Sequence, residues 1–282
     1  MKSEGGLRQI QVACQLMKTS VIAIISAFTV AGSALAADPF TYDPGMPGEV
    51  YTASTLRGSI GLRYWYSQGS NEFNGALGTA NAENVTGHTA EVFGVLEDIS
   101  TRTSVKGMVG FGKNAKGDQT WVGVTSNDWN TTNLGYVLLD GGWEVARFAG
   151  GKGRIKALVG YHYLSDKTSA TYFGTQTRGM TNNWHAVRLG VAADGKLSDR
   201  IGWSVDAAAV PWSYNQNTDG FITLESEYTY GFEADAALNV ALTNNWDIGI
   251  GGRYWWLHSE YELDQSQTYQ RYGLLIESKY KF

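Results

Sequence analysis

Cysteine and proline are scarce in this 282-residue sequence, which has one cysteine and four prolines. Cys14 precedes an N-terminal apolar run that we expect to be removed, so the mature chain is predicted to have no disulfide, thiolate metal site or cysteine nucleophile. Beyond the N-terminus, no apolar run approaches the roughly 20 residues that a membrane-spanning helix needs, which excludes a helical membrane protein. The formal net charge of −5 gives no reason to expect a nucleic-acid partner.

Common catalytic and metal-binding motifs are also missing. The sequence has no Gly-x-Ser-x-Gly nucleophile elbow, and no His-Glu-x-x-His or paired-carboxylate metal motif stands out. The glycine-rich stretch GGKGR at 150–154 lacks the spacing of a phosphate-binding loop, and a glycine-containing turn explains it. The sequence therefore predicts neither a cofactor nor a metal site.

The N-terminus has the pattern of a secretory signal peptide. Lys18 precedes the apolar stretch TSVIAIISAFTVAGSALA, which ends in the small-x-small pattern of a signal peptidase site. We expect residues 1–36 to be removed, with Met17 as an alternative start of translation. A short N-terminal membrane anchor is the other interpretation of this run.

The rest of the chain repeats one pattern, in which apolar and polar side chains alternate. In 228–240, tyrosine, phenylalanine, alanine, leucine and valine occupy every second position, and mostly polar residues lie between them. A period of two is typical of a β-strand with two different faces. The pattern predicts ten strands, at 55–67, 86–97, 102–112, 132–146, 153–165, 184–195, 200–211, 225–241, 246–258 and 269–282.

The predicted connections alternate between short and long. Four short turns separate long polar segments at 68–85, 113–131, 166–183, 212–224 and 259–268. Outer-membrane barrels have short periplasmic turns, longer external loops and an even strand number. We therefore predict an all-β fold, a closed antiparallel transmembrane β-barrel of ten strands in an up-and-down meander, at 54–282 after a periplasmic segment at 37–53. A secreted β-sandwich is the competing fold, and eight or twelve strands remain possible if a hairpin has been split or fused.

Aromatic residues lie at the ends of the apolar face, as in the interfacial girdles of membrane barrels. The chain also ends on an aromatic residue, which resembles the signal by which bacterial outer-membrane barrels are recognised by their assembly machinery. The predicted lipid-interface girdle consists of Tyr64, Tyr66, Tyr161, Tyr163, Tyr228, Tyr254, Trp256 and Tyr272 at the outer end, and Trp246, Tyr280 and Phe282 at the inner end.

The opposite face carries acidic and basic residues in nearly equal numbers. Buried charges persist only when they are paired, and a barrel of about eight strands is just filled by its own side chains. We therefore predict a lumen blocked by ion pairs, with an ion-conducting path as the alternative. The predicted lumen charge network contains Arg63, Glu91, Glu144, Arg188, Glu233, Asp235, Arg253 and Glu277.

The stretch GDQTW at 117–121, at the outer end of the third predicted strand, resembles a motif of the omptin family. Omptins are ten-stranded outer-membrane proteases that bind lipopolysaccharide, and their Asp-x-Asp-Trp-like motif is matched here by Asp118, Gln119 and Trp121. The position of the second acid is Thr120. In the family's Asp-x-His pair, Asp219 matches the acid and Phe221 stands where the histidine would be.

The resemblance implies a protease mechanism in which an Asp–His pair activates a water molecule. A general base needs a pKa near the working pH, and an unassisted aspartate, with a reference pKa of about 3.9, is a poor base at neutral pH. We therefore predict a monomeric, non-proteolytic outer-membrane barrel of omptin-like architecture, with a structural or surface-binding role through long external loops. Outer-membrane lipids and lipopolysaccharide are the expected partners. An endopeptidase that uses Asp118 and Asp219, and a small-solute porin, are the alternatives.

Overall fold

The computed structural model describes residues 55–75, 78–218 and 223–282. The predicted signal peptide at 1–36 and the predicted periplasmic segment at 37–53 lie outside these residues. In the described part of the chain, no helix is long and apolar enough to cross a membrane. The strands are β1 (Leu56–Gly75), β2 (Gly78–Asp98), β3 (Thr103–Trp121), β4 (Val124–Ser126), β5 (Thr132–Phe148), β6 (Gly153–Tyr172), β7 (Gln176–Lys196), β8 (Ile201–Thr218), β9 (Thr223–Glu225), β10 (Tyr228–Ala241), β11 (Trp246–Tyr261) and β12 (Gln265–Lys281), with a 3₁₀ turn η1 at Ala149–Gly151.

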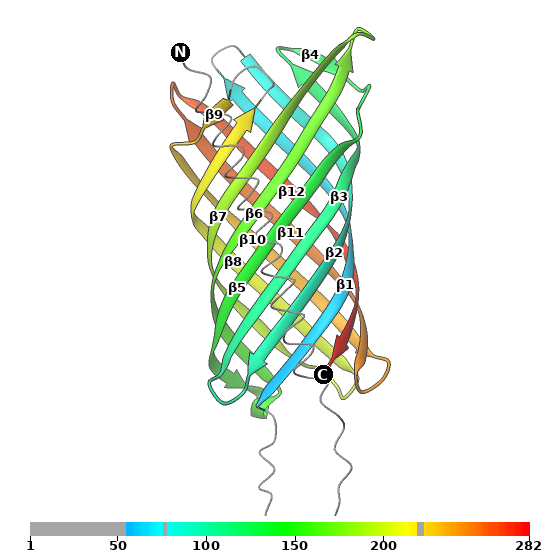
Figure 1. The fold of residues 1–282 in the computed structure, drawn as a ribbon, viewed down its shortest axis with the longest axis vertical. Coiled ribbons are helices and arrows are strands. Elements are labelled where there is room, and N and C mark those ends of the chain that lie inside the picture. Colours follow the sequence, from blue (N-terminus) through cyan, green and yellow to red (C-terminus); the bar gives the residue numbers. More distant parts are fainter. Residues whose placement is uncertain (1–54, 76–77, 219–222) are drawn as a thin grey trace, which may run out of the picture. The chain divides into compact units, whose positions relative to one another are not determined.

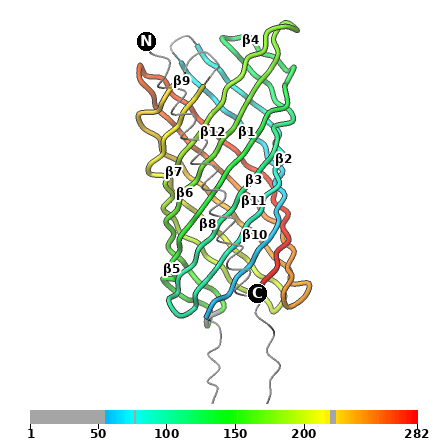
Figure 2. The backbone as a smooth tube through the Cα atoms, in the orientation of Figure 1, coloured from blue at the N-terminus to red at the C-terminus, as the bar shows by residue number. Residues whose placement is uncertain are grey.

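The ten long strands form a closed antiparallel barrel (Figure 1). Each long strand pairs with its neighbour in the sequence, and the ring closes through pairing of β1 with β12. Figure 2 shows the same strands as tubes, all inclined to the axis of the barrel. The predicted fold class, an up-and-down barrel of ten strands, is confirmed. The predicted strand at 225–241 is divided, since residues 226–227 separate β9 from β10.

The predicted long loops are the main error of the sequence analysis. Most of 113–131 and 166–183 is strand, and β6 and β7 are 20 and 21 residues long, where about 9–11 residues span a membrane. Pairing of β6 with β7 continues without a break to Tyr172↔Gln176. Threonine, serine and asparagine are frequent in these segments and are typical of loops, but the same side chains form cross-strand pairs in an exposed sheet. In 113–131 and 166–183, extended strands therefore replace most of the predicted loops.

The inward faces of the strands pack against one another across the barrel. Trp65, Trp184 and Trp255 are fully buried, with apolar neighbours from six other strands. Glycine provides the space that the large rings require: a Cβ at Gly110 would lie 2.1 Å from the ring of Tyr136. The interior is thus a packed core, and the outward face carries the exposed apolar side chains.

Candidate functional site

Two arginines form ion pairs with three carboxylates in one of two charge groups in the middle of the barrel. Arg63 contacts Glu91 and Glu277, each at 2.7 Å. Arg253 lies 2.7 Å from Glu91 and forms a bidentate pair with Asp235, with both nitrogen–oxygen distances at 2.8 Å. Glu91 is therefore shared by both guanidinium groups. Both the Arg253 and Glu91 side chains are completely inaccessible to solvent.

A second group of charges surrounds Arg188. Its guanidinium lies 2.5 Å from Asp140, 3.0 Å from Asp206 and 2.6 Å from Glu233. The other Glu233 oxygen lies 2.6 Å from Nδ1 of His162, and both of these side chains are buried. Sequence reasoning placed His162 on a strand without giving it a partner. Its inward position in the alternation of 153–165 was the signal for a lumen contact.

Of the eight residues in the predicted network, seven belong to these two groups. The exception is Glu144, which pairs with Arg147 at 2.5 Å near the inner end of β5. A β-bulge between Glu144 and Ala146 changes the alternation at this point. Glu144 itself still lies on the inward face, opposite Lys156 on β6, so the period-two count gave its face correctly but not its position near the inner end of the barrel.

An aromatic cluster covers the charge network. The rings of Trp65 and Trp255 lie 4.7 Å apart, and Tyr136 lies 4.9 Å from Trp255. The guanidinium of Arg253 contacts the faces of all three rings at 5.0–5.5 Å, a cation–π arrangement that strengthens when solvent is excluded. The Tyr136 hydroxyl donates to Glu91 at 2.8 Å. Charged and aromatic side chains from β1, β2, β5 and β11 therefore contact one another inside the barrel.

A further buried ion pair lies nearer the outer end. Arg271 donates to Asp166 at 2.9 Å, to Asn114 at 2.9 Å and to Ser67 at 2.9 Å. Its Nε donates to the Tyr269 hydroxyl at 2.8 Å. Asp166 belongs to a segment that the sequence analysis treated as a loop, so its inward position was not predicted.

Amide and hydroxyl side chains form the next layer toward the outer end. Gln267 accepts from Asn215 at 2.7 Å and from Tyr261 at 2.5 Å, and it donates to Asn71 at 2.7 Å and to Asn182 at 2.6 Å. All five side chains are buried. Burial raises the pKa of the Tyr261 hydroxyl, so it remains a donor. These four amides and Tyr261 come from five strands, and all five lie within segments predicted as long loops, which is why sequence reasoning missed them.

Of the two predicted catalytic acids, Asp118 lies within the described residues. Asp118 accepts a hydrogen bond from Asn84 at 2.8 Å on an exposed part of β3. Its neighbour Gln119 points into the barrel and is fully buried, and the Gln119 carbonyl accepts from the Tyr172 hydroxyl at 2.8 Å. Asp219 lies outside the described residues, so the pair stays a prediction. No group of three or more His, Cys, Asp or Glu residues in the described part could hold a metal ion.

The predicted girdle residues all lie on the outward face of the sheet. Eight of the eleven are exposed by 41–51%, and Tyr163, Tyr254 and Trp256 are partly covered by neighbours. Phe282 extends the pairing of the last strand, because its backbone exchanges two hydrogen bonds with Gly58, at 2.9 and 3.0 Å. The aromatic ring of Phe282 also fills the space over Gly58.

Basic residues lie on the outward face just beyond these aromatic residues. Tyr66 is opposite His88 on β2, and His88 is opposite Lys113 on β3. Lys116 and Lys167 lie further along β3 and β6, and all three lysines are exposed. The arrangement combines aromatic rings at one level with cationic groups above them, on the face that a lipid layer would cover.

Three outer turns place a large apolar residue where glycine or asparagine is usual. Val122, Phe173 and Leu263 have φ values of +48°, +52° and +63°. A side chain in this left-handed region costs about 1–2 kcal/mol, and the β-branched valine is especially unfavourable there. The three residues are also 57%, 80% and 80% exposed. The tips therefore combine backbone strain with exposed apolar surface.

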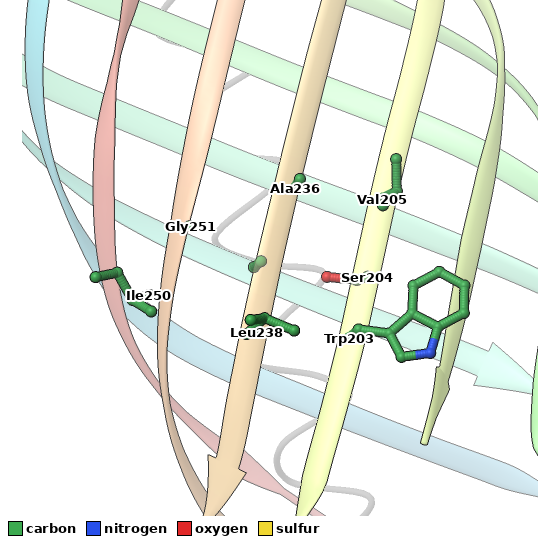
Figure 3. A pocket seen from close by; sticks show the side chains of 8 residues that line it. Trp203, Ser204, Val205, Ala236, Leu238, Ile250 and Gly251 are labelled. Atoms are coloured by element: carbon green, nitrogen blue, oxygen red, sulfur yellow. The ribbon is translucent and has the colours of Figure 1, made fainter. Parts of the chain in front are cut away.

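A shallow apolar groove crosses β8, β10 and β11 on the outward face (Figure 3). Trp203, Val205, Ala236, Leu238 and Ile250 contribute its side chains, and its volume is about 380 Å³. The small side chain of Ala236, between larger neighbours, produces the depression. Its lining is almost entirely apolar, as expected for a surface that faces hydrocarbon.

Comparison with solved structures finds an outer-membrane barrel of similar fold. The outer membrane protease OmpT from Escherichia coli superposes with a TM-score of 0.58 at 10% sequence identity, covering 84% of this chain and 99% of that chain. The translocator domain of the autotransporter NalP from Neisseria meningitidis (TM-score 0.38, 11% identity, 94% and 98% covered) and Ail from Yersinia pestis (0.31, 8%, 80% and 99%) are more distant barrels. Neither the scan against protein-family models nor the search of curated proteins finds a match. The chain therefore has the fold of the ten-stranded, omptin-like outer-membrane barrels.

Proposed function

We propose that this protein is a non-proteolytic barrel of the bacterial outer membrane that binds partners at the cell surface through the outer extensions of its strands. We call the parts of the strands beyond the outer aromatic girdle the strand extensions. The observation that carries the proposal is their length. On β6, nine residues follow Tyr163 before the turn, which is about 30 Å of strand at roughly 3.3 Å per residue. Strand pairing continues through this part, so the extensions form a rigid surface outside the membrane.

The composition of the interior supports a binding role over transport. Charged, aromatic and amide layers follow one another along the barrel, each made of buried side chains. A channel needs a continuous polar path, and the buried Trp65, Tyr136 and Trp255, which contact one another and Arg253 inside the barrel, oppose such a path. A porin is therefore the less favoured role, and the outer surface is the part that remains free for partners.

The amide layer also argues against proteolysis. At the level where the omptin resemblance would place a water-activating group, the buried side chains are amides and hydroxyls such as Gln119, Gln267 and Asn215. None of these groups accepts a proton at neutral pH. Asp118 lies on the outward face and its carboxylate is bonded to Asn84, which directs it away from the interior.

We further propose that lipopolysaccharide covers the outward face next to β3 and β6. The exposed Lys113, Lys116 and Lys167 lie above the aromatic residues, at the level where phosphate groups of the lipid would be, and lysine is a common phosphate ligand. Charge reversal of all three, to Glu, is expected to weaken lipopolysaccharide binding about tenfold, because each exposed ion pair contributes up to about 1 kcal/mol. Reversal of Lys152 and Lys196 at the inner end is the control and is expected to change little.

The binding role is tested by shortening the extensions. Cells that display the full barrel are compared with cells displaying a variant in which short turns replace 114–131 and 166–183. Attachment is counted on supported lipid bilayers, immobilised glycans and extracellular-matrix proteins. Attachment to at least one surface that the shortened barrel loses supports the proposal, and equal attachment to every surface by two correctly folded barrels contradicts it. Cleavage of a dibasic peptide that is lost in Asp118→Ala would contradict the non-proteolytic assignment.

A further inference from the structure

Two neighbouring hairpins end in apolar turns at the outer edge of the barrel. The turn between β3 and β4 is Val122-Gly123, and the turn between β6 and β7 is Phe173-Gly174, with positive φ at all four residues. Val122 is 57% exposed and Phe173 is 80% exposed. We call these two turns the apolar apex.

The apolar apex is a rigid unit, because the two hairpins are bonded to each other. The Ser126 hydroxyl donates to the Thr171 carbonyl at 2.5 Å, and the Thr171 amide donates to the Asp128 carbonyl at 2.8 Å. A β-bridge joins Trp129 to Ala170. Figure 1 shows β4 beside the outer ends of the long green strands. Val122 and Phe173 are thus presented on one framework rather than on separate loops.

The residues behind the apolar apex are aromatic, hydroxyl-bearing and cationic. Trp121 directly precedes the first turn, and behind it Thr120 and Thr125 exchange a hydrogen bond at 2.9 Å. The guanidinium of Arg178 lies 6.0 Å from the centre of the Trp121 ring. A protein segment that enters a bilayer interface combines such side chains, with apolar ones in the hydrocarbon, indole at the interface and cations at the phosphates.

The third apolar tip has different surroundings. Leu263, in the turn between β11 and β12, is also 80% exposed, but Glu260, Glu262 and Asp264 surround it in the sequence, and all three are exposed. Carboxylates next to an inserting side chain would have to lose their hydration. Leu263 is therefore a matched control, with equal exposure and an unsuitable charge environment.

We propose that the apolar apex inserts into the outer leaflet of an apposed phospholipid bilayer, so that the barrel attaches its cell to a second membrane. This inference rests on the proposed surface-binding function and names the partner. A bilayer fits better than a protein, because the apex presents two protruding side chains instead of a broad apolar surface. The contact of a single barrel is weak, and many copies on one cell surface would act together.

The inference is tested by flotation with phosphatidylcholine vesicles. The full-length protein is folded into lipid nanodiscs and mixed with these vesicles, and the co-floating fraction gives the partition coefficient. Phe173→Ser is expected to lower that coefficient about tenfold to a hundredfold, the effect of no longer burying one phenylalanine side chain. Val122→Ser is expected to have a smaller effect, and Leu263→Ser should bind like the unmodified protein.

A fluorophore at the apex distinguishes insertion from other kinds of attachment. An environment-sensitive dye on Phe173→Cys, in a chain that also carries Cys14→Ser, should shift to shorter wavelengths when vesicles are added, and the same dye on Leu263→Cys should not. No flotation by demonstrably folded protein, or equal loss in Phe173→Ser and Leu263→Ser, would overturn the inference. If vesicle binding fails while the strand extensions still mediate attachment to glycans or matrix proteins, only the choice of a bilayer partner is wrong, and the proposed function stands.

Discussion

Replacement of Arg253 by methionine is expected to destabilise the barrel, because this arginine is a buried member of the central charge network. The guanidinium contacts Glu91 at 2.7 Å and Asp235 at 2.8 Å, and its side chain is completely buried. Methionine keeps most of the volume but leaves both carboxylates without this partner. Removal of one member of a buried ion pair costs about 3–5 kcal/mol, because an uncompensated charge remains.

The loss of stability in Arg253→Met is limited by Arg63, which contacts the same carboxylates. Arg63 still contacts Glu91 at 2.7 Å and lies 3.9 Å from Asp235, so we expect a loss near the lower end, about 3 kcal/mol. The free energy of unfolding is measured by urea titration of the barrel in lipid vesicles, with the heat-dependent shift on a gel as the criterion of folding.

Arg57→Met is the matched control. Arg57 lies 2.6 Å from Glu97, but its side chain is 47% exposed at the inner rim, and Glu97 keeps Arg154 and Lys156 as partners. The expected loss there is at most about 1 kcal/mol. The combination of Arg253→Met with Glu91→Gln and Asp235→Asn should recover part of the stability, since it removes the unpaired charges. Equal effects of Arg253→Met and Arg57→Met, or no recovery in the combined variant, would refute the reasoning.

Two further predictions concern packing and permeability. Gly110→Ala is expected to lower the free energy of unfolding by about 1–3 kcal/mol through overpacking, because the new Cβ would lie 2.1–2.5 Å from three ring atoms of Tyr136. At Gly135 the nearest atom to a new Cβ is 3.8 Å away, so Gly135→Ala should be neutral in the same urea titration. The folded barrel is expected to give no stepwise conductance in planar bilayers, because buried aromatic and ionic side chains contact one another inside it. Reproducible single-channel steps would show that this picture of the interior is wrong.

The sequence predicted the part of the fold that lies within the membrane, and the reason is physical. Lipid outside and a packed core inside impose opposite demands on successive residues, so the alternation in 228–240 identifies both a strand and its two faces. In the parts of the strands outside the membrane, the packed core still constrains the inward residues, but no lipid constrains the outward ones. The outward residues of 166–183 are therefore polar, as in a loop, and the pairing of β6 with β7 to Tyr172 could not be read from them.

The pairing of interior charges needed information that a single sequence does not contain. The inward position of Arg253 and Glu91 follows from the alternation, but their contact joins β11 to β2 and depends on the register of the strands between them. Local irregularities shift that register, as the bulge beside Glu144 does. The strained turns at Val122 and Phe173 were also beyond prediction, because turn residues are normally recognised by glycine, asparagine or proline.

The most direct test of the account is the accessibility of single cysteines on intact cells. In a chain with Cys14→Ser, Phe173→Cys marks the outer turn between β6 and β7, and Asp199→Cys marks the turn between β7 and β8 at the other end of the barrel. A membrane-impermeant maleimide should label position 173 on intact cells and position 199 only after the outer membrane is permeabilised. Labelling of position 199 on intact cells, with position 173 protected, would contradict the orientation of the barrel and with it the proposed role of the strand extensions.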